Sequence, residues 1–576
     1  MFSKTRIFSA VVLLAALIVG AGCDGIADLD VENENAPDAE RAIANASDLK
    51  SVLAGGYTSW WDAAYENDTP FAMPAPHLHG WGDAMTTTNA FAGFWSVATD
   101  EPRPAFQNTL SFSDLNIIET PWLNLNAAIS ASNDVIRQIE TNNFEVIVDG
   151  DDQTQMTLAA AYFLRALSYG HLANFFNQAY ITDATFDPEQ DLSGLGFSPY
   201  TEVLQQSRDD FDRVREIAGA NAFTMDNFLP FTVPVSNDRL IALSNSFEAR
   251  FVISNPRTPE EAASIDWTEI QTLAQDGIQE SVVMDLDGNT WSNAWQEVSG
   301  LYWYWRVDNR IINMMDADYP IKYPAGEAGA AIPPAESDDE RLCPAAGDEF
   351  QGSGVGTAAE LGCYFVYDTD QSFFRINRGP TLQSNYWYAR DFVIEQWFLE
   401  PFGAGPGPIM LAEENRLMRA EAAVNLGNLP AAIDLINSGS RVNVGGLDPL
   451  PDDATEQEVL DAIYYERDIE LYRTGLGLPY YDLRRRGQLQ AGTPLHLPVP
   501  ATELQTIGQE LYTFGGVGNA GQPGTASGDN AWCDQGDLSC SGPFEVPAAT
   551  ESTNDALLQD IDPFGFSGSP LQPPQR

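Results

Sequence analysis

Apolar side chains recur every three or four residues in several long stretches of this chain, which is the spacing of one face of an α-helix. These stretches cover residues 47–65, 119–140, 153–176, 198–218, 240–253, 259–278 and 411–437. Short turns separate several of them, so antiparallel helix pairs are expected. The pattern therefore predicts a mainly α protein.

The stretch 153–176 is apolar on two faces of its predicted helix. One face carries Leu158, Tyr162, Tyr169, Leu172 and Phe176, and the other carries Leu164, Leu167 and Phe175. Such a helix should be buried between neighbours. Two helix starts are also indicated: Ser47 and Asp48 offer capping oxygens for the first helix, and Pro121 suits a first turn.

The stretch 411–437 predicts a helix hairpin. Leu426-Gly427-Asn428 ends one helix, and Pro430 starts the next. This unit resembles a tetratricopeptide hairpin, which buries its apolar face by stacking on neighbouring units. No strict 34-residue period is present, so the sequence does not predict a regular solenoid.

Two regions, residues 66–115 and about 283–400, lose the helical period and are rich in Gly, Pro, Asn and aromatic residues. Long irregular segments in an ordered protein are often functional. Aromatic residues in them that could bind a ligand are Trp81, Trp95, Trp291, Tyr302, Trp303, Tyr304 and Trp305. A single Trp is more often a core residue, but their concentration in these regions favours a binding platform. In an extended chain Tyr302 and Tyr304 would face one side, and Trp303 and Trp305 the other.

Composition narrows the possible partners. The chain has 83 acidic and 29 basic residues and a formal net charge of −54, and Lys occurs only at Lys4, Lys50 and Lys322. The negative field repels nucleic acid and anionic membrane surfaces. An acidic, lysine-poor chain suggests a salt-rich habitat, where a short Debye length removes most of the self-repulsion.

The amino terminus has the features of a secretory signal. Residues 1–22 contain Lys4, Arg6 and an apolar run shorter than a membrane span, and small residues precede Cys23. Cys23 after Gly-Ala-Gly resembles a bacterial lipobox, which predicts a lipidated Cys23. The alternative is a plain signal peptide with an incidental Cys. Residues 23–40 are acidic and lack periodicity, which is typical of a flexible tether.

The other four cysteines are even in number, and the chain is predicted to leave the reducing cytoplasm. Proximity favours Cys343 with Cys363 and Cys533 with Cys540, although crossed pairings remain open. A zinc site is the less favoured alternative, because neither pair has CxxC spacing. His77 and His79 are better explained as a pair of loop histidines, so no metal site is predicted.

Four stretches in order resemble the SusD/RagB family of nutrient-binding lipoproteins. The first is "NENAPDAERAIANASDLKSVLAGGY", after Cys23. The others carry the matching positions Arg165-Ala166 and Tyr169, then Glu414 and Ala420-Glu421-Ala422, then Glu466, Arg467, Glu470, Leu471 and Gly475. The sequence departs from the family at Thr474, where Glu is common, and in "LGLPYY" before Asp482.

This resemblance implies a single SusD-like domain over residues 41–576. Its helical scaffold would comprise 41–282 and 405–510, with a loop-rich ligand-binding insertion at 283–404 and a C-terminal tail at 511–576. It also implies a lipid-anchored outer-membrane protein that faces the cell exterior, binds oligosaccharides without a cofactor and delivers them to a SusC-like TonB-dependent transporter.

Other function classes stay open. A peptide-binding uptake lipoprotein, a secreted glycosidase and a structural helical-repeat protein are the alternatives. With 83 acidic residues, pairs of carboxylates arise at any spacing, so they do not indicate a glycosidase. No nucleotide-binding or nucleophile-elbow motif is present, and the chain is not expected to be an enzyme.

Two local patterns have competing explanations. Arg484, Arg485 and Arg486 stand side by side and could bind an anion, but the family resemblance favours a scaffold role in which they pair with Asp482, Glu466 and Glu470. The stretch "DLDGN" at 285–289 has too few oxygen ligands in register for an EF-hand and is expected to be a turn.

Overall fold

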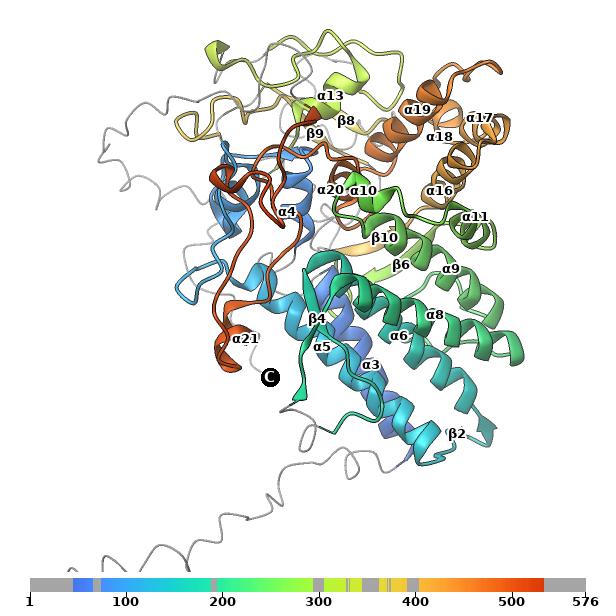
Figure 1. Cartoon of the computed structure of the whole chain (residues 1–576). Coiled ribbons are helices and arrows are strands. Elements are labelled where there is room, and N and C mark those ends of the chain that lie inside the picture. Colours follow the sequence, from blue (N-terminus) through green and yellow to red (C-terminus); the bar gives the residue numbers. More distant parts are fainter. Residues whose placement is uncertain are drawn as a thin grey trace, which may run out of the picture.

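A computed structural model describes residues 45–65, 74–187, 194–293, 305–327, 330, 332–343, 362–369, 371, 374–390 and 403–532. The predicted signal peptide, Cys23, the tether and the Cys533–Cys540 pair lie outside these residues. The prediction of a mainly α fold is confirmed, because helices form the body of the molecule and the strands are short (Figure 1).

Five long helices in the first half of the chain pack in sequence order. They are α3 (Ala46–Ala64), α5 (Asn116–Ile136), α6 (Thr154–Phe175), α8 (Tyr200–Ala220) and α9 (Asn237–Ser254). Each helix contacts the next one along the chain, so they form the row of blue to green helices in Figure 1. This arrangement is the one expected from apolar stretches joined by short connections.

The row continues with α11 and with helices from the second half of the chain. They are α11 (Trp267–Gln275), α16 (Ala412–Asn425), α17 (Leu429–Asn437), α19 (Glu456–Ile469) and α20 (Leu478–Arg485). The predicted hairpin is confirmed as α16 and α17. Gly427 takes a positive φ of 73° at the turn, where a residue without Cβ is favoured. The Asn428 side chain then caps α17, and Pro430 lies in its first turn.

Helix α6 is the centre of the core, as its two apolar faces predicted. Every residue from Met156 to Phe175 is buried. A Cβ atom on Gly170 would lie 2.2 Å from the ring of Phe251, which shows how closely α6 and α9 approach. The helix therefore has neighbours on both sides, and its side-chain volumes are tightly constrained.

Two predicted helix starts were wrong. Helix α3 is capped by Asn45, whose side-chain oxygen accepts hydrogen bonds from the backbone N–H groups of Ser47 and Asp48. Helix α5 begins at Asn116, so Pro121 lies within the helix and not in its first turn. Asn45 therefore accounts for the earlier start of α3, whereas α5 starts after Leu115 without a side-chain cap.

The stretch 259–278 is two helices instead of one. Helix α10 (Pro259–Ala262) ends after one turn, and Asp266 then caps α11 by accepting hydrogen bonds from the N–H groups of Thr268 and Glu269. Ser, Thr, Asn and Asp side chains compete for backbone donors in this way. The interruption allows α11 to pack against α16.

The residues that match the family motifs are buried and hold helices together. Arg165 of α6 forms two hydrogen bonds with Asp210 of α8, at 2.8 and 2.6 Å. Glu414 of α16 pairs in the same bidentate way with Arg250 of α9. Planar guanidinium groups match carboxylates in this geometry. These motif residues therefore belong to the scaffold.

Short elements connect the scaffold. Helical ones are α4 (Ala75–Trp81), α13 (Asn309–Met315), α18 (Ser440–Asn443), α21 (Ala501–Thr506), the 3₁₀ turns η1 (Phe91–Gly93), η5 (Ala325–Glu327) and η7 (Val517–Asn519), and the π turns η2 (Phe94–Thr99) and η3 (Arg137–Thr141). Antiparallel strand pairs are β1 (Met85–Thr86) with β7 (Arg306–Val307), β2 (Ile147–Val148) with β3 (Asp151–Asp152), β4 (Gln178–Tyr180) with β5 (Phe197–Pro199), β6 (Val282–Asp287) with β10 (Ala404–Met410), and β8 (Phe365–Tyr367) with β9 (Tyr386–Tyr388).

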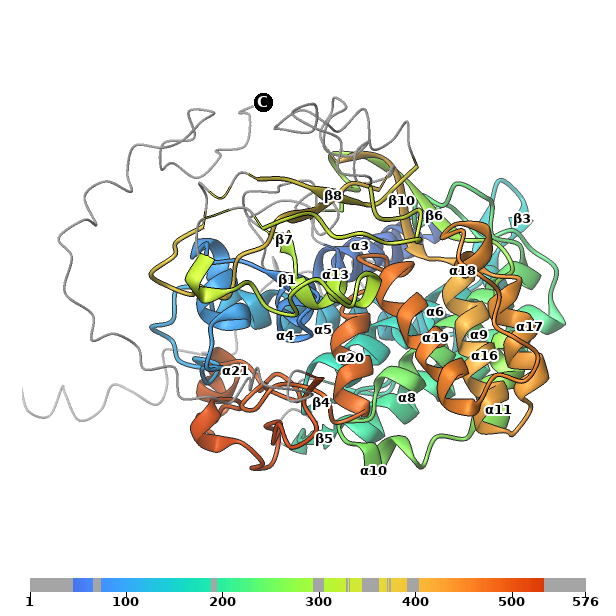
Figure 2. The ribbon, with the colours of Figure 1, turned by 90° about the horizontal axis from the view of Figure 1, so that it is seen from above.

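The structure brings the two irregular regions of the sequence together. Strand β1 from the first region pairs with β7 from the second, and the N–H of Asp308 donates to the carbonyl of Ala84 at 3.0 Å. In Figure 2 the elements α4, β1, β7 and α13 lie together to one side of α8, α9 and α16. Residues far apart in sequence thus form one loop-rich body beside the helical row.

The Cys343–Cys363 disulfide is confirmed. Its two cysteines are buried with Val366, Trp387 and Ala389 in a small separate apolar cluster. The bond therefore closes the segment that leads into β8.

The stretch 285–289 ends strand β6 and turns at Gly288, which has a φ of 69°. The Asp287 carboxylate accepts hydrogen bonds from the N–H groups of Asn289 and Trp291, so the expected turn is confirmed. In the described ranges no three His, Cys, Asp or Glu side chains are placed to hold a metal ion. Among the same residues no helix is long and apolar enough to cross a bilayer.

Candidate ligand-binding surface

A tight turn in residues 89–95 places an aromatic side chain on the surface of the loop-rich body. The Asn89 side chain accepts a hydrogen bond from the N–H of Phe91 at 2.9 Å, and its carbonyl accepts one from Trp95 at 3.0 Å. Ala92 and Gly93 both take positive φ values, of 49° and 69°. This left-handed pair reverses the chain, so Phe94 is buried while Phe91 is 39% exposed.

A second loop, residues 374–382, lies alongside this turn. The N–H of Arg375 donates to the Thr88 hydroxyl at 2.6 Å, and the Arg378 guanidinium donates to the Thr88 carbonyl at 3.2 Å. The Arg378 guanidinium also lies 4.9 Å from the centre of the Trp95 ring, within the range of a cation–π contact. Ile376 projects from this loop and is 44% exposed.

We call these residues the Trp95 surface. It comprises Phe91, Trp95, Arg375, Ile376 and Arg378, which lie over the buried Thr88. Trp95 is half-buried, and its enclosed indole N–H has no hydrogen-bond acceptor among the residues that the structure describes. The surface therefore offers apolar ring and aliphatic area beside guanidinium donors, which is the mixture that fixes a polar ligand with apolar faces.

Two of the expected platform residues are core residues instead. Trp81 is 1% exposed, and its indole N–H donates to the carbonyl of Val97 at 2.8 Å. Trp305 is also 1% exposed, and its ring centre lies 4.5 Å from that of Phe94. Both rings fill the interior beneath the loops, where they bury a large apolar area. The expectation that they face a ligand is wrong for this structure.

The other expected platform residues are one described ring, Trp291, and three residues outside the described ranges. Trp291 is half-buried and meets the edge of Trp61 on α3, with ring centres 5.6 Å apart. Tyr302, Trp303 and Tyr304 lie outside the described residues. Of the chosen rings that the structure describes, Trp95 alone belongs to this surface.

Sequence reasoning missed Phe91, Arg375, Ile376 and Arg378. A search for Trp and Tyr pairs overlooks an isolated Phe and an aliphatic residue. The usable signal was the "NAFAGFW" stretch, because Asn and Gly around a Phe indicate a turn that can expose it. The approach of the 374–382 loop depends on tertiary packing and has no local signal.

The three adjacent arginines have a scaffold role, as expected, but their partners differ in part. Arg485 pairs with Glu421, at 2.6 and 2.9 Å, and with Asp482. The guanidinium of Arg486 lies 3.9 Å from the centre of the Tyr464 ring. The predicted partners Glu466 and Glu470 pair instead with a distant residue, Arg341, because α19 presents them to the loop that precedes the disulfide.

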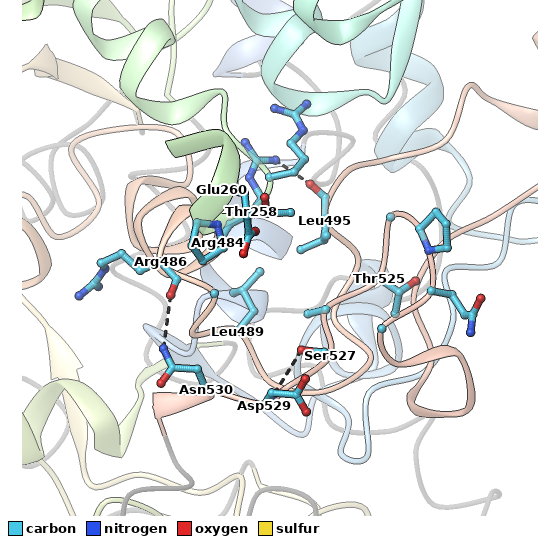
Figure 3. Close-up of a pocket in the computed structure, with 18 residues that line it drawn as sticks. Thr258, Glu260, Arg484, Arg486, Leu489, Leu495, Thr525, Ser527, Asp529 and Asn530 are labelled. Atoms are coloured by element: carbon cyan, nitrogen blue, oxygen red, sulfur yellow. Dashed lines mark hydrogen bonds between the residues drawn. The ribbon is translucent and has the colours of Figure 1, made fainter. Parts of the chain in front are cut away.

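Arg484 lines a hollow of about 480 Å³ between α10, α20 and the C-terminal loops (Figure 3). Its guanidinium donates to the backbone carbonyls of Ser254 and Leu495 at 2.6 and 2.7 Å. Arg257, also in the wall, donates to Ala173 at 2.7 Å. Burial and then the like charge of Arg484 lower the pKa of Arg257 to about 9.

The rim of this hollow carries exposed Glu260 and Asp529, whereas the Arg486 side chain extends away from its centre (Figure 3). The terminal nitrogens of Arg257 and Arg484 already donate to carbonyl groups, and the rim has negative charge. The hollow is therefore a poor site for an anion, and the arginines in it hold α6, α9 and the C-terminal loops together.

Several solved structures of the SusD superfamily are similar to this chain. One from Parabacteroides distasonis has 15% identity and a TM-score of 0.48, covering 79% of this chain and 97% of that chain. A SusD-like carbohydrate-binding protein from Bacteroides fragilis has 12% identity and a TM-score of 0.49, covering 76% and 86%. A chitin-binding SusD homolog from Flavobacterium johnsoniae has 12% identity and a TM-score of 0.47, with the same coverages.

Neither a protein-family model nor a curated protein matches the sequence.

Proposed function

We propose that this protein binds a glycan on the Trp95 surface. The observation that carries the proposal is the exposure of Phe91 and Ile376 beside Trp95 and Arg378. Sugar rings present apolar C–H faces that stack on aromatic rings, and their hydroxyl groups accept hydrogen bonds from Arg. Exposed apolar residues that gather at one place commonly mark a binding site.

The cell-surface part of the proposal rests on the sequence. Lipidation at Cys23 would hold the protein at the outer membrane, and the family resemblance suggests delivery of the glycan to a SusC-like TonB-dependent transporter. In native membranes solubilised with mild detergent, the transporter should co-purify with the wild-type protein, and Cys23→Ala should leave the membrane fraction. Unchanged membrane partition of Cys23→Ala would contradict the anchor, and absence of any such transporter would indicate a free-standing binder.

The first prediction concerns the rings of the Trp95 surface. We expect Phe91→Ala and Trp95→Ala each to weaken glycan binding about five- to tenfold, because one stacking contact contributes about 1 kcal/mol. The measurement is retardation in native gels that contain a soluble polysaccharide, with the melting temperature recorded in parallel. A turnover assay on the same polysaccharide should show no products.

Leu426→Ala is the matched control, because Leu426 is a 41% exposed apolar residue at the α16–α17 turn. It should bind as wild type does. The proposal is wrong if Phe91→Ala and Trp95→Ala keep full affinity at an unchanged melting temperature. Retention of a peptide library in place of any glycan would favour the peptide-binding alternative, and turnover would favour an enzyme.

A further inference from the structure

The segments that build the Trp95 surface lack acidic residues. Residues 84–99 and 371–390 contain no Asp or Glu, although 83 of the 576 residues of the chain are acidic. The second segment contributes Arg375, Arg378 and Arg390. In a protein with a net charge of −54, this local composition removes the negative charge that would repel an anionic ligand.

Arg375 is the most informative of these residues. It is half-buried, and its hydrogen bonds within the described residues are made by its backbone: its N–H donates to Thr88, and its carbonyl accepts the N–H of Arg378. Its guanidinium forms no ion pair there, whereas Arg165, Arg250, Arg341 and Arg485 all pair with buried carboxylates. An arginine that the scaffold does not use can donate to a ligand.

Arg378 adds a second positive charge at the same place. Its guanidinium lies over the Trp95 ring, and it bonds to the Thr88 carbonyl. The aromatic ring and the carbonyl both help to orient it. An acidic residue also lies near the turn, since the Cβ of Asp114 is 3.4 Å from the position that a Cβ atom on Gly93 would take.

Because charges near the surface act over only a few Å at high ionic strength, these arginines matter for a ligand in direct contact. A guanidinium beside an aromatic ring suits an acidic sugar, whose ring face stacks while its anionic group accepts paired hydrogen bonds. We propose that the glycan bound by the Trp95 surface is anionic and carries carboxylate or sulfate groups. This inference rests on the proposed function and specifies its ligand class.

The test compares polymers that differ only in charge. Polygalacturonate is compared with its methyl ester, which is neutral, and dextran sulfate with dextran. Binding is measured in affinity gels at several KCl concentrations. For the matching anion type we expect the charged polymer to bind at least about tenfold more tightly than its neutral partner, with a difference that shrinks as KCl is raised. The two pairs distinguish a carboxylate from a sulfate ligand.

The variant Arg375→Gln should lower the affinity for the charged polymer about fivefold and change the affinity for the neutral polymer less than about twofold. Its control is Arg213→Gln, which removes the same charge from a side chain that is 40% exposed on α8. Both variants change the net charge of the protein equally. Because Arg213 is not part of the Trp95 surface, the control should bind as wild type does.

Three outcomes would overturn the inference. Equal binding of charged and neutral polymers would show that the ligand need not be anionic, while glycan binding itself would stand. An equal loss of affinity in Arg375→Gln and Arg213→Gln would also overturn the inference. Absence of binding to all four polymers, charged and neutral, would count against the proposed function as well. Preference for the charged polymer, together with a loss of affinity in Arg375→Gln but not in Arg213→Gln, supports the inference of an anionic glycan.

Discussion

Arg341→Ala is expected to destabilise the protein by at least about 3–5 kcal/mol, because it leaves buried carboxylates without their cation. The Arg341 side chain is fully buried. It donates to Asp339 at 2.9 and 2.7 Å and to Glu466 at 2.7 and 2.9 Å, and it reaches Glu470 at 3.3 Å. The residue thus joins the segment before the disulfide to helix α19.

The measurement is the loss in unfolding free energy or melting temperature at one fixed, high salt concentration. The matched control is Arg213→Ala, which breaks exposed ion pairs with Glu140 and Glu216 and should cost no more than about 1 kcal/mol. If the two variants lose equal stability, Arg341 does not have the role assigned to it. Both variants lose one arginine, but the control leaves the ion pairs of Arg341 with Asp339 and Glu466 intact. The difference between the two variants therefore measures the contribution of those buried ion pairs.

The second large effect is a dependence of stability on pH at Asp308. Its carboxylate caps α13 by accepting the N–H of Arg310 at 2.9 Å. Burial is the main cause that raises the pKa of Asp308 to about 7, and the neighbouring charge of Asp83 adds to it. A raised pKa means that the folded state favours the protonated form. Its contribution to stability is present below the unfolded pKa near 3.8 and is lost as the pH rises through 7.

We therefore expect Asp308→Asn to be more stable than the wild type at pH 8, by about 2–4 kcal/mol, with the difference disappearing near pH 4. Asn retains the capping oxygen, so the substitution removes the charge and little else. Denaturant unfolding at both pH values measures the difference. Equal stability of the two proteins at pH 8 would show that Asp308 is not held in an unfavourable charged state.

Helices of the scaffold were predictable because their apolar periodicity is a local property. The hairpin 411–437 and the doubly apolar stretch 153–176 appear as α16–α17 and α6. Helix starts were less predictable, since several polar residues near each start can cap it. Asn45 and Asp266 took that role, and the sequence alone does not rank them against Ser47 or Asp48.

The candidate ligand-binding surface was predictable in part. The sequence indicated that two irregular regions would supply it, and Trp95 lies where they meet. It did not separate Trp95 from Trp81 and Trp305, because burial of a Trp depends on contacts from distant segments. Trp305, for example, packs on Phe94 across more than two hundred residues of sequence. The neighbours Arg375 and Ile376 became visible only through their contact with Thr88 and their exposure.

The scarcity of Lys has a further physical explanation in the structure. The sequence suggested a salt-rich habitat, and the folded chain uses Arg165, Arg250, Arg341 and Arg485 in buried pairs with carboxylates. Lys cannot replace them, because its ammonium group does not form the planar two-pronged contact. Part of the preference for Arg therefore comes from the scaffold.

Side-chain footprinting by hydroxyl radicals tests whether a glycan binds on the Trp95 surface. The polysaccharide that is retarded most strongly in the affinity gels would be added at saturation. We predict protection of Phe91, Trp95 and Ile376, with unchanged reactivity of Leu426 at the α16–α17 turn. Unchanged reactivity of Phe91, Trp95 and Ile376, with protection of Pro523 at the hollow instead, would contradict binding on the Trp95 surface.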